Sequence, residues 1–134
     1  MQRFVVSGTL ASLLTGIVFA IWPAAGPWTV EDYQATSREQ ELTSAELVML
    51  RAHRSDPSPQ HTDALVTFPS FHTILAILSA IALWDVRKVR WLALAICMAV
   101  CISTVTTGWH YAVDVLAGIA VALIGYRASA RLVR

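Results

Sequence analysis

Residues 91–126 read WLALAICMAVCISTVTTGWHYAVDVLAGIAVALIGY and contain two long apolar runs on either side of a short polar stretch. The first run extends from Trp91 to about Thr107, and the second extends from about Tyr111 to Tyr126. A membrane's hydrocarbon core needs about 20 apolar residues in a helix, with roughly 17–25 tolerated. Both runs approach that length and are candidate membrane spans.

Two further apolar runs lie upstream, from Phe4 to Trp22 and from about Leu65 to Trp84. Hydrophobic residues make up 56% of the 134-residue chain, more than the roughly 45–50% that is usual in a soluble domain. Tryptophan or tyrosine lies near most ends of the runs, as in the aromatic belts of membrane proteins. We therefore expect an all-α integral membrane helical bundle that forms a single domain over residues 1–134. Its four transmembrane helices would cover about residues 4–22, 65–84, 91–107 and 111–126.

The first run also has an alternative interpretation. Arg3, the apolar run and the small residues Ala24 and Ala25 resemble a secretory signal peptide. The run is long for a signal core, and Trp22-Pro23 fits a cleavage site poorly. These features favour a membrane span.

Positive charges are distributed unequally between the connections. The long segment 28–67 carries three arginines against seven acids. The other side carries seven positive residues: Arg3, Arg87, Lys88, Arg90, Arg127, Arg131 and Arg134. The positive-inside rule then predicts cytoplasmic termini and an outer loop over residues 28–64, in a plasma or bacterial inner membrane. Within that loop, Thr43-Ser44-Ala45-Glu46 matches a capping box and predicts a short helix from Ser44 to His53.

Outside its loops the chain has few ionisable side chains, namely His72, His110 and Asp114. Ionisable groups are costly at membrane depth, so each is a functional candidate. The predicted topology places all three at the outer ends of their helices. Two distant segments would therefore deliver polar groups to the same depth and the same side.

The spacing of these residues suggests phosphoryl-transfer chemistry. Residues i and i+4 share a helix face, so the Asp114 carboxylate can reach the His110 imidazole. A carboxylate on one ring nitrogen fixes the tautomer and makes the other nitrogen a better nucleophile or base. A second histidine, His72, would then protonate a leaving group. The opening turn of the second span, beside Ser70, offers free backbone N–H groups to an anion such as phosphate.

Other interpretations of the same residues remain open. Either histidine alone is typical of an interfacial side chain, and His110 with Asp114 fits a structural hydrogen bond. Ser70 after Pro69 also fits a helix N-cap. His72 and His110 facing each other would suit a haem, or a metal together with Asp114.

Two motifs resemble the type 2 phosphatidic acid phosphatase superfamily, and within it the inositol-phosphorylceramide-synthase-like branch. The first is Phe68-Pro69-Ser70-Phe71-His72-Thr73, and the second is Gly108-Trp109-His110-Tyr111-Ala112-Val113-Asp114-Val115-Leu116-Ala117-Gly118. The resemblance covers most of the chain, including the first helix, which ends at Pro23-Ala24-Ala25-Gly26-Pro27. Six helices are usual in the family, and this chain corresponds to the family from its third helix onward.

The resemblance implies a role for each candidate residue. His110 would be the nucleophile that forms a phosphohistidine, and Asp114 would orient it. His72 would be the acid for the leaving alcohol, and Ser70 would touch the phosphate. The resemblance implies neither a metal nor another cofactor.

The chain departs from the family pattern at its basic residues. The family's Lys six residues before Arg-Pro is absent, and the chain's one lysine, Lys88, falls on the cytoplasmic side. Arg51, with Arg54 behind it, is our substitute for the phosphate-binding charge, although a solvated helix charge fits equally. The family's Ser-Arg ahead of the catalytic histidine reads Ser103-Thr104 here. Phe71 replaces the family's usual glycine. Sphingolipid-synthase-like members resemble this chain in lacking the arginine of the Ser-Arg motif.

The sequence therefore predicts a metal-independent membrane phosphatase or phosphotransferase, a hydrolase or transferase of lipid metabolism. It would act on a lipid phosphate or phosphodiester at the outer leaflet. Its partners would be the lipid substrate, the membrane and either a second copy or a partner subunit, with no nucleic acid. The alternatives are a haem- or metal-binding membrane bundle and a catalytically inactive, truncated family member.

Overall fold

The computed structural model describes residues 2–29, 38–52 and 67–133, apart from the side chains of residues 50 and 51. Within these ranges the regular structure is helical throughout and contains no strand, which confirms the all-α prediction. In chain order the elements are α1 (Gln2–Ile21), the 3₁₀ turn η1 (Pro27–Thr29), α2 (Arg38–Arg51), α3 (Phe71–Ala82), α4 (Arg90–Thr106) and α5 (Ala112–Leu132).

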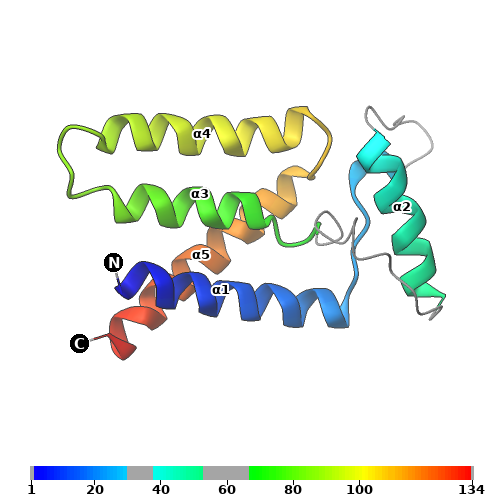
Figure 1. Ribbon diagram of the computed structural model, residues 1–134, viewed down its shortest axis with the longest axis horizontal. Helices are drawn as coiled ribbons and strands as arrows, with labels where there is room; N and C mark the ends of the chain where they lie inside the picture. The colour runs from blue at the N-terminus through cyan, green and yellow to red at the C-terminus, as the bar shows by residue number, and fades with distance from the viewer. Residues whose placement is uncertain (1, 30–37, 53–66, 134) are drawn as a thin grey trace.

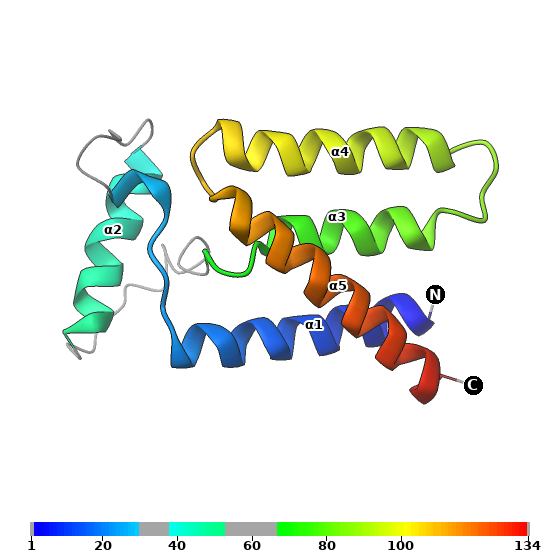
Figure 2. The same ribbon diagram turned by 180° about the vertical axis from the view of Figure 1, so that it is seen from behind.

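Four of the helices form a bundle in which α3 lies between α1 and α4 (Figure 1). From behind, α5 crosses α3 and α1 obliquely (Figure 2). Both chain ends and the α3–α4 connection lie at one end of this bundle, and α2 lies at the other end beside the α4–α5 turn (Figure 1). The candidate site residues at the start of α3 and of α5 are therefore at the end that α2 occupies.

The bundle core is small and joins three helices. Its buried members are Ala11 of α1, Ile74 and Leu78 of α3, and Val121 and Ala122 of α5. Small residues on α5 let the helix backbones approach closely, as is common in membrane bundles. An added Cβ at Gly118 would lie 2.7 Å from the Ser70 carbonyl oxygen, and one at Gly125 would lie 3.0 Å from the Ser7 carbonyl oxygen.

Helix length supports two of the predicted membrane spans. Within the described residues, α1 with 20 residues and α5 with 21 are long and apolar enough to cross a bilayer. Helices α3 and α4 are apolar, but they have 12 and 17 residues, at or below the lower limit for a span. Many large side chains point outward, including Leu13, Ile17 and Leu116, as expected of surfaces that face lipid. The four-span arrangement stays a prediction.

Several helix ends differ from the predicted ones. Helix α3 begins at Phe71 rather than near Leu65, because Pro69 disfavours helical geometry just before it and Ser70 is the N-cap. Helix α5 continues past Tyr126 to Leu132. Helix α2 begins at Arg38, six residues before the predicted start, and acidic residues in its first turn suit a helix N-terminus.

The predicted capping box at Thr43–Glu46 is wrong. Thr43 lies inside α2, where its hydroxyl donates a hydrogen bond to the Glu39 carbonyl oxygen at 2.7 Å. The predicted helix end at His53 and most of the predicted outer loop lie outside the described residues.

Candidate active site

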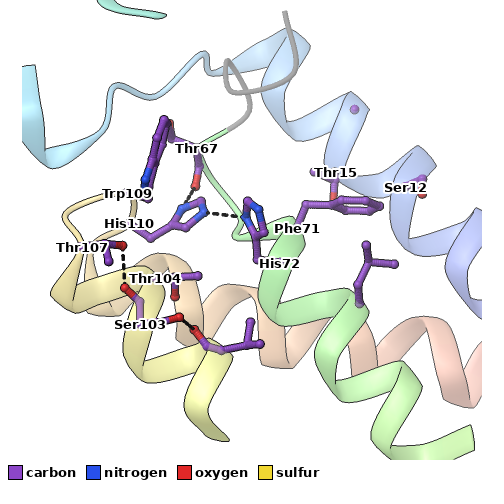
Figure 3. A pocket seen from close by; sticks show the side chains of 13 residues that line it. Ser12, Thr15, Thr67, Phe71, His72, Ser103, Thr104, Thr107, Trp109 and His110 are labelled. Carbon is purple, nitrogen blue, oxygen red and sulfur yellow. Dashed lines mark hydrogen bonds between the residues drawn. The ribbon is translucent and has the colours of Figure 1, made fainter. Parts of the chain in front are cut away.

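The two histidines that the sequence singled out are in contact. His72 lies in the first turn of α3, and His110 lies in the turn between α4 and α5. The Nε2 atom of His110 is 3.4 Å from Nδ1 of His72, and the ring centroids are 5.7 Å apart at an interplanar angle of 64° (Figure 3). The fold thus joins groups 38 positions apart in the chain.

The turn that carries His110 is held by backbone hydrogen bonds. Gly108 has φ 75°, a left-handed conformation that glycine adopts without steric cost. The N–H groups of Trp109 and His110 then donate to the Thr104 carbonyl oxygen at 3.1 and 3.0 Å. His110 is buried, with 4% of its surface exposed. Little freedom remains for its position.

A backbone carbonyl fixes the tautomer of His110. Its Nδ1 lies 2.8 Å from the Thr67 carbonyl oxygen. A carbonyl only accepts, so Nδ1 carries a proton, and in the neutral ring Nε2 carries the lone pair. The contact between the histidines then requires His72 to donate through Nδ1–H. Thr67 was not among the residues singled out from the sequence, because any residue type can supply a carbonyl.

Asp114 lies close to His110, but its main hydrogen bond goes elsewhere. Helix α5 begins at Ala112, so His110 precedes the helix on which the i, i+4 geometry was expected. The buried Asp114 carboxylate accepts the Tyr111 N–H through Oδ2 at 2.8 Å. The same oxygen is 3.6 Å from His110 Nδ1, which is ion-pair distance but too long for a hydrogen bond. Asp114 therefore caps α5 and places a negative charge beside the imidazole.

The histidine pair forms part of the wall of a cavity of about 800 Å³. Helices α1, α3 and α4 and the α4–α5 turn all contribute to it (Figure 3). The lining residues are Ser12, Thr15, Gly16, Thr67, Phe71, His72, Leu75, Val100, Ser103, Thr104, Thr107, Trp109 and His110. Neither lysine nor arginine is among these described residues. The wall instead combines apolar side chains, hydroxyl groups and the two imidazoles.

A family model described as the PAP2 superfamily matches residues 1–128. The chain belongs to the PAP2 superfamily. Members of this superfamily are phosphatases and phosphotransferases, so its general class of chemistry is phosphoryl transfer. No curated protein and no solved structure matches the chain. The inositol-phosphorylceramide-synthase-like branch therefore stays a prediction.

Ser70 of this PAP2 superfamily member is fully buried at the start of α3. Its Oγ accepts hydrogen bonds from the N–H and the hydroxyl of Thr73 at 3.4 and 3.2 Å, which makes it the N-cap of α3. Its own N–H donates to the Asp114 carbonyl oxygen at 3.0 Å. Ser70 thus links the two helix ends of the site, and its contact with phosphate stays a prediction.

The predicted charge for the phosphate falls on side chains that the structure does not describe. Arg51 is the last residue of α2, and both its side chain and the whole of Arg54 lie outside the described residues. Arg51 as a phosphate ligand stays a prediction. Within the described ranges, no three His, Cys, Asp or Glu residues gather as a metal site would need. The haem- or metal-binding alternative has only the His72–His110 pair to rest on there.

Proposed function

We propose that the protein is a membrane phosphatase or phosphotransferase that acts on a lipid phosphate or phosphodiester through a phosphohistidine at His110. One observation carries the proposal. The Thr67 carbonyl holds the His110 proton on Nδ1, so the Nε2 lone pair is directed at His72 on the cavity wall. A neutral imidazole with a free Nε2 lone pair is the form that can attack phosphorus.

In the first half-reaction, His110 Nε2 attacks phosphorus, and the bond between phosphorus and the leaving oxygen breaks. His72 enters this step as the imidazolium, protonated on both ring nitrogens, and gives its Nδ1 proton to that oxygen, so the alcohol leaves as a neutral molecule and His72 is left neutral. The resting contact of 3.4 Å occupies the Nε2 lone pair. Substrate binding must therefore displace the His72 ring, which then stays within reach of the leaving oxygen. Asp114, 3.6 Å from Nδ1, stabilises the positive ring of the phosphohistidine.

In the second half-reaction, an oxygen nucleophile attacks phosphorus and gives its proton to His72. The P–N bond breaks, and both imidazoles return to their starting states. Water as the nucleophile gives a phosphatase, whereas a second alcohol gives a head-group transferase.

We propose that the site faces the outer side of the membrane and that both termini face the cytoplasm. The chain ends and the α3–α4 connection lie at the end of the bundle opposite α2 (Figure 1). These segments carry the seven positive residues that the sequence places on the predicted cytoplasmic side. By the positive-inside rule this end is cytoplasmic, and the histidine pair lies toward the other face.

The experiment compares detergent-purified wild type, His110→Ala and Thr106→Ala with EDTA present. Thr106 is exposed and does not line the cavity, so its variant is the matched control. The substrates are a panel of lipid phosphomonoesters and phosphodiesters, with phosphate release and head-group transfer both measured. We expect turnover by wild type and Thr106→Ala, and a loss of about 10³-fold or more in His110→Ala. Full activity in His110→Ala would refute the proposal, and so would a wild type that shows neither phosphate release nor head-group transfer. In the second case, an absorbance spectrum tests the haem alternative.

A further inference from the structure

One hydroxyl group on α1 differs from its neighbours. Three other hydroxyl side chains of this helix donate to the carbonyl four residues earlier: Ser7 to Arg3 at 2.6 Å, Thr9 to Val5 at 3.0 Å and Ser12 to Gly8 at 2.9 Å. Such local bonds are the usual way to satisfy a hydroxyl in a helix. Thr15 Oγ1 has no hydrogen-bond partner among the described residues, although only 4% of the Thr15 surface is exposed.

Leaving a buried hydroxyl without a partner destabilises a protein, so a native example calls for an explanation. Thr15 lines the cavity of the histidine pair. In Figure 3, Thr15 and Phe71 are drawn on the other side of His72 from His110. The free hydroxyl is therefore at the end of the site away from the nucleophile. A molecule that extends from His110 past His72 would meet it.

The surroundings of Thr15 restrict what that molecule presents there. The same cavity wall includes the apolar side chains of Phe71 and Leu75 from α3, and Gly16, the next residue of α1. An added Cβ at Gly16 would meet nothing within 4 Å, so the cavity is open at the residue next to Thr15. A charged group in this apolar part of the cavity would be costly, whereas a neutral hydrogen-bond acceptor would not.

We propose that Thr15 donates a hydrogen bond to a carbonyl oxygen in the backbone of the lipid substrate, of the kind found in esters and amides. This inference rests on the proposed function, because it takes the phosphate to be at His110. His72 protonates the leaving oxygen, so the leaving group lies on the far side of His72, toward Phe71 and Thr15. The first carbonyl of an acyl lipid follows its phosphate within a few bonds. Thr15 is then a specificity residue that distinguishes acyl lipids from alkyl lipids.

The test uses a diacyl glycerophospholipid and its dialkyl ether analogue with the same head group. The ether analogue lacks the carbonyl groups but keeps the phosphate and the chains. Three variants are compared with wild type. Thr15→Val removes the hydroxyl and keeps the shape, Thr15→Ser keeps the hydroxyl, and Thr9→Val makes the same change on an exposed part of α1.

We expect Thr15→Val to lower kcat/KM for the diacyl lipid by about 3- to 10-fold, the effect of one neutral hydrogen bond. Its kcat/KM for the ether lipid should equal that of wild type. Thr15→Ser and Thr9→Val should keep the wild-type preference for the diacyl lipid. An unchanged diacyl rate in Thr15→Val, or an equal loss on both lipids, would overturn the inference and leave the proposed function standing. If the wild type is inactive on both lipids but turns over other members of the panel, the inference alone is overturned; if it turns over none, both proposals are overturned.

Discussion

At the scale of single residues, the site depends on which nitrogen of His110 carries the proton. The Thr67 carbonyl and the Asp114 carboxylate lie on the same side of the ring, at 2.8 and 3.6 Å from Nδ1. The carbonyl sets the tautomer, and the carboxylate supplies charge. These roles can be separated by mutation, because Asp114 also caps α5 through the Tyr111 N–H.

We expect Asp114→Asn to fold normally and to lose activity. Asparagine keeps an oxygen that can accept the Tyr111 N–H but has no charge. Two unit charges about 4 Å apart near a protein surface interact by about 4 kcal/mol. If the transition state loses over half of this electrostatic stabilisation, kcat falls by about 10²-fold. Asp114→Ala should additionally lower the free energy of unfolding by about 1–2 kcal/mol, because the cap is lost. Steady-state kinetics and thermal unfolding in detergent test both points, and wild-type kcat in Asp114→Asn would show that the charge is not used.

The sequence identified the side chains of the site better than their hydrogen bonds. The meeting of His72 and His110 could be expected from two motifs at the same ends of neighbouring helices. The contact of His110 with Thr67 could not, since a backbone carbonyl leaves no mark in the sequence. Thr15 was also not singled out, because its unpartnered hydroxyl becomes visible only beside the bonded hydroxyls of Ser7, Thr9 and Ser12.

At the scale of elements, the crossing of α5 and α3 sets the depth and angle of the histidine pair. We expect Gly118→Ala to lower the free energy of unfolding by about 1–3 kcal/mol through overpacking. The new methyl group would lie 2.7 Å from the Ser70 carbonyl oxygen, at the N-cap of the helix that carries His72. Gly8→Ala is the matched control, because its methyl group would meet nothing within 4 Å. Equal melting temperatures for the two variants would contradict this packing.

Helix α2 restrains the turn that carries His110. Gln40 is fully buried, and one of its contacts is a hydrogen bond from Nε2 to the Thr107 carbonyl oxygen at 3.3 Å. We expect Gln40→Ala to lower both kcat and the melting temperature, because the turn loses a tether at its start. Glu41→Ala changes the exposed neighbour on the same helix and should affect neither. If both variants melt and turn over like wild type, α2 does not support the site.

Helix ends show where an apolar pattern stops being informative. The apolar pattern predicted the bounds of α1 and α4 closely, because the apolar runs and the helices coincide there. It ended α5 too early, because a helix continues through Arg127 and Arg131 even though a membrane core does not. It started α3 too early, because Pro69 and Ser70 determine a helix start regardless of hydropathy. The polar helix α2 gave only a local capping signal, and that signal was misleading at Thr43.

At the scale of the whole molecule, the orientation in the membrane is open to a direct test. In a background with Cys97 and Cys101 changed to Ala, single cysteines are introduced as Glu41→Cys and Lys88→Cys. Both positions are exposed and lie at opposite ends of the bundle. We expect a membrane-impermeant maleimide to label Glu41→Cys in intact cells and Lys88→Cys only after the membrane is opened. The reverse pattern would place the histidine pair on the cytoplasmic side.

The central claim is that phosphorus becomes bonded to Nε2 of His110, and rapid quenching tests it most directly. Wild type, His110→Ala and Thr106→Ala are mixed with a ³²P-labelled lipid that the wild type turns over, quenched in alkali, and digested for mass spectrometry. The account predicts an alkali-stable, acid-labile phosphoryl group on the peptide containing His110 in wild type and Thr106→Ala, and none in His110→Ala. Turnover by the wild type without label on that peptide, or label that persists in His110→Ala, would contradict it.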